Sequence, residues 1–90
     1  MLTDEQLAAA LADLPGWQED GPRIRRVYEF ANFTRAMQFV HRVADLAEAQ
    51  DHHPEILVQY RLVTLTLWSH DSGGVTKRDV RLAHAIDRKF

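Results

Sequence analysis

The chain has 90 residues and a mass of 10.4 kDa, the size of one small domain spanning residues 1–90. Its formal net charge of −2 argues against a surface built to bind nucleic acid directly. Cysteine is absent, which excludes disulfides, thiolate metal sites and cysteine nucleophiles. No apolar run reaches the roughly 20 residues of a membrane span, and no signal peptide is recognisable. We therefore expect a cytoplasmic protein that does not associate with membranes.

The predicted elements are, in chain order, a helix at 3–13, strands at 17–19 and 23–30, a helix at 33–50, an extended segment at 56–69 and a helix at 77–88. Thr3 and Gln6 have the spacing of a capping box, which favours a helix start at Thr3. Asn32 and Thr76 are suitable N-cap residues for the two later helices. This order predicts an α+β fold in which the helices cover one face of an antiparallel sheet. The other face must meet water or another subunit.

The segment 56–69 alternates between two kinds of side chain. Val63, Leu65 and Leu67 fall on one face, and threonines fall between them. This pattern predicts extended structure with one dry face and one half-polar face. It leaves open whether the segment forms one strand or two.

The long helix carries a wide apolar stripe made of Phe33, Ala36, Met37, Val40, Val43, Ala44 and Ala47. Phe39 and Leu46 flank this stripe and widen it. Two interpretations are open: a broad core-facing surface, or a subunit contact through this helix.

Histidine is the residue type best suited to chemistry here, because imidazole both accepts and donates protons near neutral pH. His41 and His84 lie within predicted helices, and we interpret both as surface or interface residues. His52 and His53 lie at a helix end before a proline, and His70 ends the extended segment. The sequence holds no HExxH motif or other metal-ligand spacing, so we expect no metal and no cofactor.

The run from Glu48 to Asp79, EAQDHHPEILVQYRLVTLTLWSHDSGGVTKRD, resembles the pterin-4a-carbinolamine dehydratases. The likeness extends through the flanking pattern over nearly the whole chain. It implies a helix-strand-strand-helix-strand-strand-helix fold with a four-stranded antiparallel sheet, in which the segment 56–69 folds as a hairpin near Tyr60. The implied catalytic residues are His52, His53, His70 and Asp79. The implied substrate-binding residues are Glu48, His53, Pro54 and Tyr60.

The reaction of that family is the dehydration of 4a-hydroxytetrahydropterin to quinonoid dihydropterin, a step of tetrahydrobiopterin recycling. By resemblance, His52 and His70 are the general acid and base, in an order that the sequence leaves open. His53 would hold the pterin. Asp79 would fix a histidine tautomer or bond the pterin, in addition to capping its helix. Glu48 would steady His52 from one helical turn earlier.

The resemblance also implies a homodimer or homotetramer that binds a small-molecule pterin and needs no metal. A different class of function remains open, because some relatives act without catalysis as dimerisation partners of a transcription factor. A pterin-handling role in another pathway is a third hypothesis.

Overall fold

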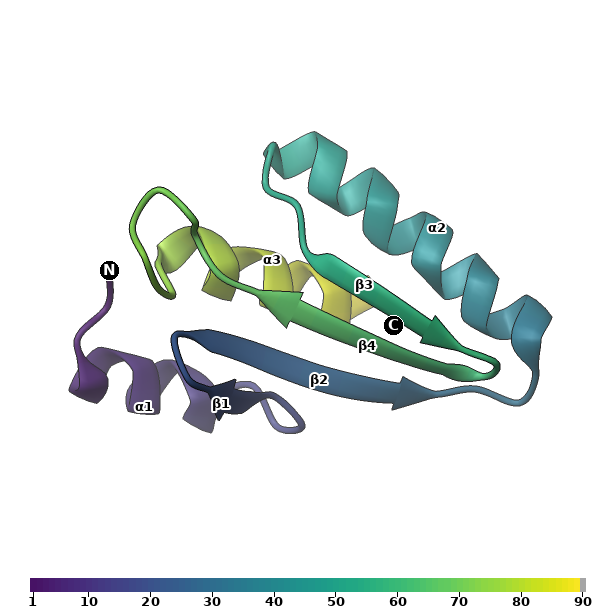
Figure 1. Ribbon diagram of the computed structural model, residues 1–90, viewed down its shortest axis with the longest axis horizontal. Helices are drawn as coiled ribbons and strands as arrows, with labels where there is room; N and C mark the ends of the chain where they lie inside the picture. The colour runs from purple at the N-terminus through teal and green to yellow at the C-terminus, as the bar shows by residue number, and fades with distance from the viewer. Residues whose placement is uncertain (90) are drawn as a thin grey trace.

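A computed structural model describes residues 1–89 of the chain. Its elements are α1 (Asp4–Ala12), β1 (Gln18–Asp20), β2 (Arg23–Glu29), α2 (Phe33–Gln50), β3 (Glu55–Gln59), β4 (Leu62–Leu67) and α3 (Lys77–Lys89). The expected order of helices and strands is therefore confirmed (Figure 1).

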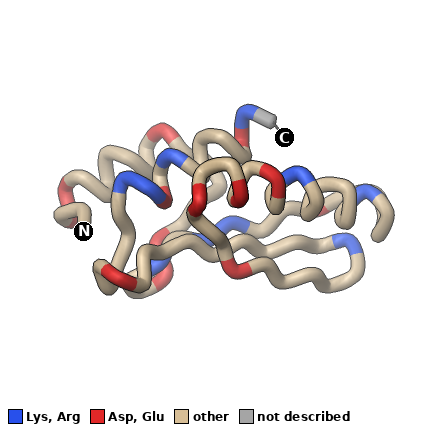
Figure 2. The backbone as a smooth tube through the Cα atoms, turned by 90° about the horizontal axis from the view of Figure 1, so that it is seen from above, with Lys and Arg blue, Asp and Glu red and all other residues tan. Residues whose placement is uncertain are grey.

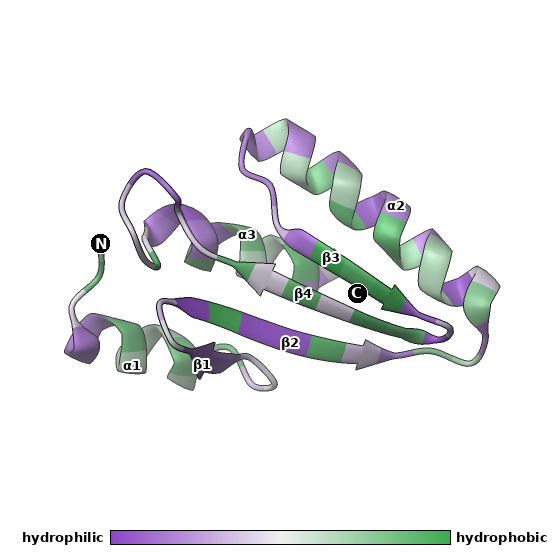
Figure 3. Ribbon diagram, in the orientation of Figure 1, coloured by the Kyte–Doolittle hydropathy of each residue, from purple (hydrophilic) through white to green (hydrophobic). Residues whose placement is uncertain are grey.

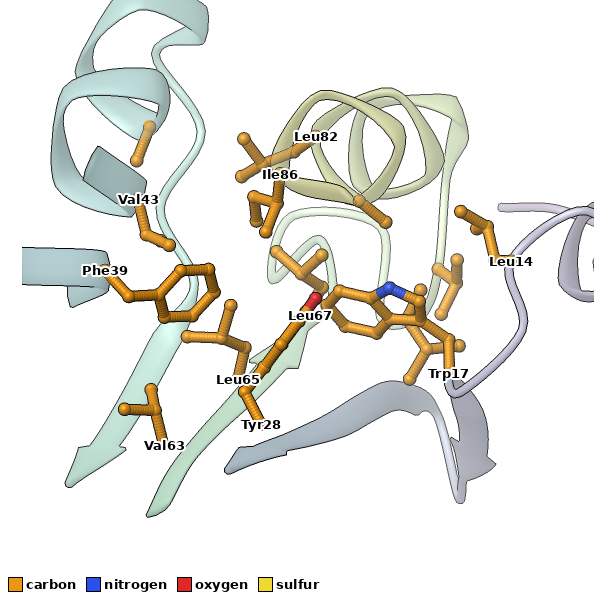
Figure 4. Packing of buried hydrophobic residues seen from close by; sticks show 14 of the residues in the cluster. Leu14, Trp17, Tyr28, Phe39, Val43, Val63, Leu65, Leu67, Leu82 and Ile86 are labelled. Carbon is orange, nitrogen blue, oxygen red and sulfur yellow. The ribbon is translucent and has the colours of Figure 1, made fainter. Parts of the chain in front are cut away.

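The four strands form an antiparallel sheet in the order β1-β2-β4-β3. β2 pairs with the whole of β4 from Ile24, opposite Leu67, to Glu29, opposite Leu62. Buried and half-buried residues alternate along β4, because successive side chains in a strand point to opposite faces. Helices α2 and α3 cover the face that carries the buried residues (Figure 4). The α+β arrangement predicted from the sequence is confirmed.

The core between this face and the helices is centred on aromatic rings. The rings of Tyr28 and Phe39 lie 4.6 Å apart, and those of Phe30 and Phe39 lie 5.0 Å apart. Trp17 meets the edge of Tyr28 at 6.4 Å. Phe39, which is only 3% exposed, thus belongs to the core of this chain and is not available as a subunit contact.

The apolar face of α2 is rotated from the one predicted. Asn32 caps the helix as expected, since its side chain accepts from the Arg35 amide at 2.9 Å. The buried positions are Ala36, Phe39, Val43 and Ala47. Phe33 and Ala44 are exposed, so their assignment to the core stripe is wrong. The helical repeat centres the buried face on Phe39 and Val43 and leaves Phe33 and Ala44 at its edge.

The N-terminal segment follows its local signals closely. The backbone amide of Gln6 donates to the Thr3 hydroxyl, and the backbone amide of Thr3 donates to the side-chain oxygen of Gln6. These two bonds complete the predicted capping box. The first strand begins one residue later than predicted, at Gln18. Trp17 is instead a core residue whose indole Nε1 donates to Asp87 Oδ2 at 3.1 Å.

The extended segment 56–69 contains a hairpin, as the resemblance implies. β3 ends at Gln59 and β4 begins at Leu62. Between them Tyr60 adopts a left-handed conformation with φ of 55°, which reverses the chain direction. The turn lies at the opposite end of β4 from the loop that leads to α3 (Figure 1).

The second face of the sheet carries exposed apolar side chains. Val27 is 51% exposed and Leu57 is 53% exposed. Both are register partners of Thr64, so the three form one row across β2, β4 and β3 (Figure 3 shows the hydropathy of these strands). Acidic and basic positions are interspersed along the chain (Figure 2). Within residues 1–89, no helix has both the length and the apolar character needed to cross a membrane.

Candidate active site

A cleft of about 370 Å³ opens where the end of α2, the end of β4 and the start of α3 meet. It is lined by Asp51, His52, His53, Trp68, Ser69, His70, Asp71 and Arg78. The three histidines of the predicted site therefore share one cleft, although 18 positions separate His52 from His70 in the sequence. His41 and His84 are not among its lining residues.

The way α2 ends directs His52 inward. Asp51 caps the helix in a left-handed conformation, with φ of 50° and ψ of 44°, so the chain leaves the helical path at this residue. The His52 amide still donates to the carbonyl of Ala47 at 3.1 Å. His52 is 9% exposed, and its imidazole turns toward α3, with Nε2 2.5 Å from Asp79 Oδ1.

Asp79 is a fully buried carboxylate surrounded by donors. Besides His52, its Oδ2 accepts from the Ser69 hydroxyl at 2.9 Å and from the Thr76 amide at 2.8 Å. The Thr76 bond is the capping interaction predicted from the three-residue spacing. A carboxylate can only accept hydrogen bonds, so His52 presents Nε2–H to Asp79, and Nδ1 is its second ring nitrogen.

Glu48 contacts His53, not His52. Its Oε2 lies 2.5 Å from His53 Nε2, and both side chains are largely exposed. The expectation that Glu48 steadies His52 is therefore wrong. That expectation assumed that Glu48 and His52 lie four residues apart on one helix. The left-handed Asp51 ends the helix before His52, so the i to i+4 geometry does not apply to this pair.

His70 follows β4 in the loop that leads to α3 and is exposed. The backbone around it is held by a bridge between Ser69 and Gly74, whose amide-to-carbonyl bond from Ser69 measures 2.9 Å. The imidazole lies against the indole of Trp68, with ring centroids 4.1 Å apart. Among residues 1–89, none forms a hydrogen bond to the His70 ring.

A charged pair lies at the rim of the cleft. Arg78 Nη2 donates to Asp71 Oδ1 at 2.6 Å. This hydrogen bond from the guanidinium holds the pKa of the Asp71 carboxyl below its usual value, so Asp71 is an anion at neutral pH. Both side chains are at least half exposed, and water weakens the pair.

Three predicted substrate-binding residues, Glu48, Tyr60 and Pro54, are not among the residues that line the cleft. Tyr60 is 67% exposed in the β3-β4 turn, separated from the cleft by the length of β4, roughly 20 Å for six residues. The structure therefore does not bring Tyr60 to the other site residues. Pro54 is half-buried between His53 and β3, where its ring restricts His53 to extended conformations.

Sequence reasoning missed several residues of the cleft. Trp68 and Ser69 had a usable signal, because alternation along β4 puts Trp68 on the His70 face and Ser69 on the core face. Asp51, Asp71 and Arg78 had none, since an exposed charge near a turn is the ordinary case.

The cleft defines a class of site: three imidazoles, one of them hydrogen-bonded to a buried carboxylate, in a small α+β fold. Among the described residues, no three histidine, aspartate or glutamate side chains are grouped as metal ligands. Such an arrangement is suited to moving protons to and from a small molecule.

The comparisons with known proteins assign the family. The family model described as pterin 4 alpha carbinolamine dehydratase matches residues 1–89. A protein of Koribacter versatilis, named "Putative pterin-4-alpha-carbinolamine dehydratase", is 56% identical over 86 residues, covering 96% of this chain and 92% of its own. A Mycobacterium tuberculosis protein of the same name is 47% identical over 90 residues, covering 100% of this chain and 96% of its own. This chain belongs to the pterin-4a-carbinolamine dehydratase family.

One solved structure agrees with this assignment, and a second shares the fold. The crystal structure of a transcriptional coactivator/pterin dehydratase from Brucella melitensis superposes with a TM-score of 0.93 at 36% identity, covering 97% of this chain and 95% of that one. A pterin dehydratase-like protein described as a RuBisCO assembly factor in the alpha-carboxysome shares the fold, with a TM-score of 0.66 at 20% identity over 80% of this chain and 83% of that one.

Proposed function

We propose that this chain catalyses the dehydration of 4a-hydroxytetrahydropterin to quinonoid dihydropterin by histidine acid/base catalysis. The proposal depends on one observation: His52, just after α2, and His70, just after β4, line the same cleft. In the reaction the C4a–O bond breaks, the hydroxyl leaves as water, and the N5–H electrons form the N5=C4a bond. One group must therefore give a proton to the hydroxyl, and another must take the N5 proton.

His52 is the better candidate for the base. Its Nε2–H is engaged by the Asp79 carboxylate at 2.5 Å, so Nδ1 is the nitrogen that would accept the N5 proton. The imidazolium formed in this way is stabilised by the buried carboxylate beside it, as in other histidine-aspartate pairs. The Ser69 and Thr76 bonds to Asp79 keep that carboxylate in place.

His70 is the better candidate for the acid. It is exposed and has no carboxylate bonded to its ring within the described part of the chain. Its ring nitrogens are thus available to donate to the leaving hydroxyl, and water can return the proton after each turnover. His53, held by Glu48 at the mouth of the cleft, would bind the pterin and take no part in the bond cleavage.

The rate of dehydration above the spontaneous background, followed by stopped-flow absorbance, tests the proposal. His52→Ala and His70→Ala should each lower it by roughly 10- to 10³-fold, because each removes one proton-transfer group. His41→Ala is the matched control, since His41 is exposed on α2 and is not a cleft residue. An equal loss in His41→Ala would contradict the site, and a wild-type rate equal to the background would contradict the activity.

Protein binding is the second candidate function. The observation that favours it is the exposed row of Val27 and Leu57 on the open face of the sheet, together with the coactivator name of the Brucella relative. If the wild type leaves the spontaneous rate unchanged, this hypothesis takes precedence.

A further inference from the structure

The three imidazoles of the cleft are held by different means. His52 and His53 each have a carboxylate on Nε2, from Asp79 and Glu48. His70 has none among the described residues, yet its ring lies 4.1 Å from the indole of Trp68, with an angle of 48° between the planes. Ring packing is therefore the contact that restricts the orientation of the His70 imidazole.

The Trp68–His70 contact follows from the strand geometry. The two residues are two positions apart in extended chain, so their side chains share a face. Leu67 and Ser69, on either side of Trp68, point into the core and are 0% and 1% exposed. The backbone that carries both rings is further fixed by the Ser69–Gly74 bridge.

Arg23 supports the indole from the neighbouring strand. Ile24 is the register partner of Leu67, which brings Arg23 beside Trp68. The Arg23 guanidinium carbon lies 4.6 Å from the centre of the Trp68 ring, within the range of a cation–π contact. Arg23 Nε and Trp68 Nε1 are both buried and find no hydrogen-bond partner among residues 1–89, so stacking rather than hydrogen bonding holds the indole.

We propose that Trp68, clamped by Arg23, is the positioning residue for His70: it fixes the plane of the imidazole while leaving both ring nitrogens free for the reaction. This inference rests on the proposed function, in which His70 is the acid. A loosely held acid would spend less time aligned with the leaving hydroxyl, and misplacement of a catalytic group by about 1 Å can cost about 10²-fold in rate.

Kinetics separates positioning from substrate binding. Trp68→Ala should lower kcat about 10-fold with KM within twofold of wild type, and Trp68→Phe should restore most of the rate because it keeps a ring against His70. In a His70→Ala background, Trp68→Ala should cost less than twofold, since the group that it positions is already gone. A raised KM with unchanged kcat, or a full 10-fold loss in the His70→Ala background, would overturn the proposal.

Arginine variants test the clamp. Arg23→Ala should lower kcat about threefold. Arg25→Ala is the matched control, because Arg25 lies two positions further along β2 and pairs with Asp20 at 3.9 Å instead of with the indole. Equal effects of the two variants on kcat would mean that the positive charge of β2, and not the contact with Trp68, is responsible.

Tryptophan fluorescence supplies a readout that is independent of activity. A protonated imidazole against an indole quenches emission by accepting an electron from the excited ring, so emission from Trp68 should be weaker in acidic than in alkaline solution. Trp68→Phe identifies this signal apart from that of Trp17, and His70→Gln should abolish it. A quenching step that persists in His70→Gln would overturn the contact. If the wild type does not accelerate dehydration but this signal is present, the proposed function fails while the ring contact stands.

Discussion

Removal of the Asp79 carboxylate should destabilise the fold as well as the site. In Asp79→Ala, the His52 Nε2–H and the Thr76 amide each lose their acceptor. The Ser69 hydroxyl still has its hydrogen bond with Thr76 Oγ1, at 2.8 Å. A donor left without its partner costs about 1–3 kcal/mol. Two of them at this boundary between the core and the cleft give a loss of about 3 kcal/mol in the free energy of unfolding.

Thermal unfolding followed by circular dichroism measures this loss. Because about 1 kcal/mol shifts the midpoint of a domain of this size by roughly 4–8 °C, Tm should fall by roughly 12–24 °C. Asp45→Ala is the control, since Asp45 is exposed on α2, and such substitutions stay within about 0.5 kcal/mol. A Tm for Asp79→Ala within about 4 °C of that control would show that the buried carboxylate does not hold these elements together.

Four further outcomes are expected. Burial and the hydrogen bond to Asp87 raise the pKa of Tyr28 above its ordinary 10.0. The free energy of unfolding, measured by urea titration, should therefore stay constant up to about pH 10 and then decline by about 1.4 kcal/mol per pH unit as the tyrosine of the unfolded chain ionises. Tyr28→Phe should remove this decline, and Tyr60→Phe should retain it. His53→Ala should raise KM more than it lowers kcat in steady-state assays, and the opposite split would place His53 in the chemical step. Dialysis against a chelator should leave the dehydration rate unchanged; loss of activity that zinc restores would refute this. Light scattering at micromolar concentration should give at least twice the 10.4 kDa of one chain, because the core is small and Val27 and Leu57 are exposed, and a monomer mass would contradict it.

Elements with local signals could be predicted from the sequence. The helix starts at Thr3 and Asn32 depend on capping bonds within three residues, and the structure confirms both. The hairpin turn had no such signal, because Tyr60 takes a left-handed conformation that favours glycine or asparagine. There the resemblance to a family gave the correct division into two strands, and periodicity alone did not.

The contacts of the candidate site are long-range, which limits what spacing can reveal. The capping role of Asp79 is local and was predicted from the spacing. Its contact with a histidine was implied only by the resemblance, because the bond to His52 spans 27 residues and depends on how α2 ends. The same helix end explains why Glu48 meets His53 instead of His52. The clamp of Arg23 on Trp68 required the register of β2 against β4, which the pattern of apolar residues does not determine.

The pH dependence of kcat/KM for dehydration, after subtraction of the spontaneous rate, tests the assignment of base and acid most directly. A base that must be neutral limits the rate at low pH, and an acid that must be protonated limits it at high pH, so the wild type should give a bell-shaped profile. His52→Ala should lose the acidic limb, and His70→Ala should lose the alkaline limb. A wild-type profile that is flat, or one that keeps both limbs in both variants, would contradict the account.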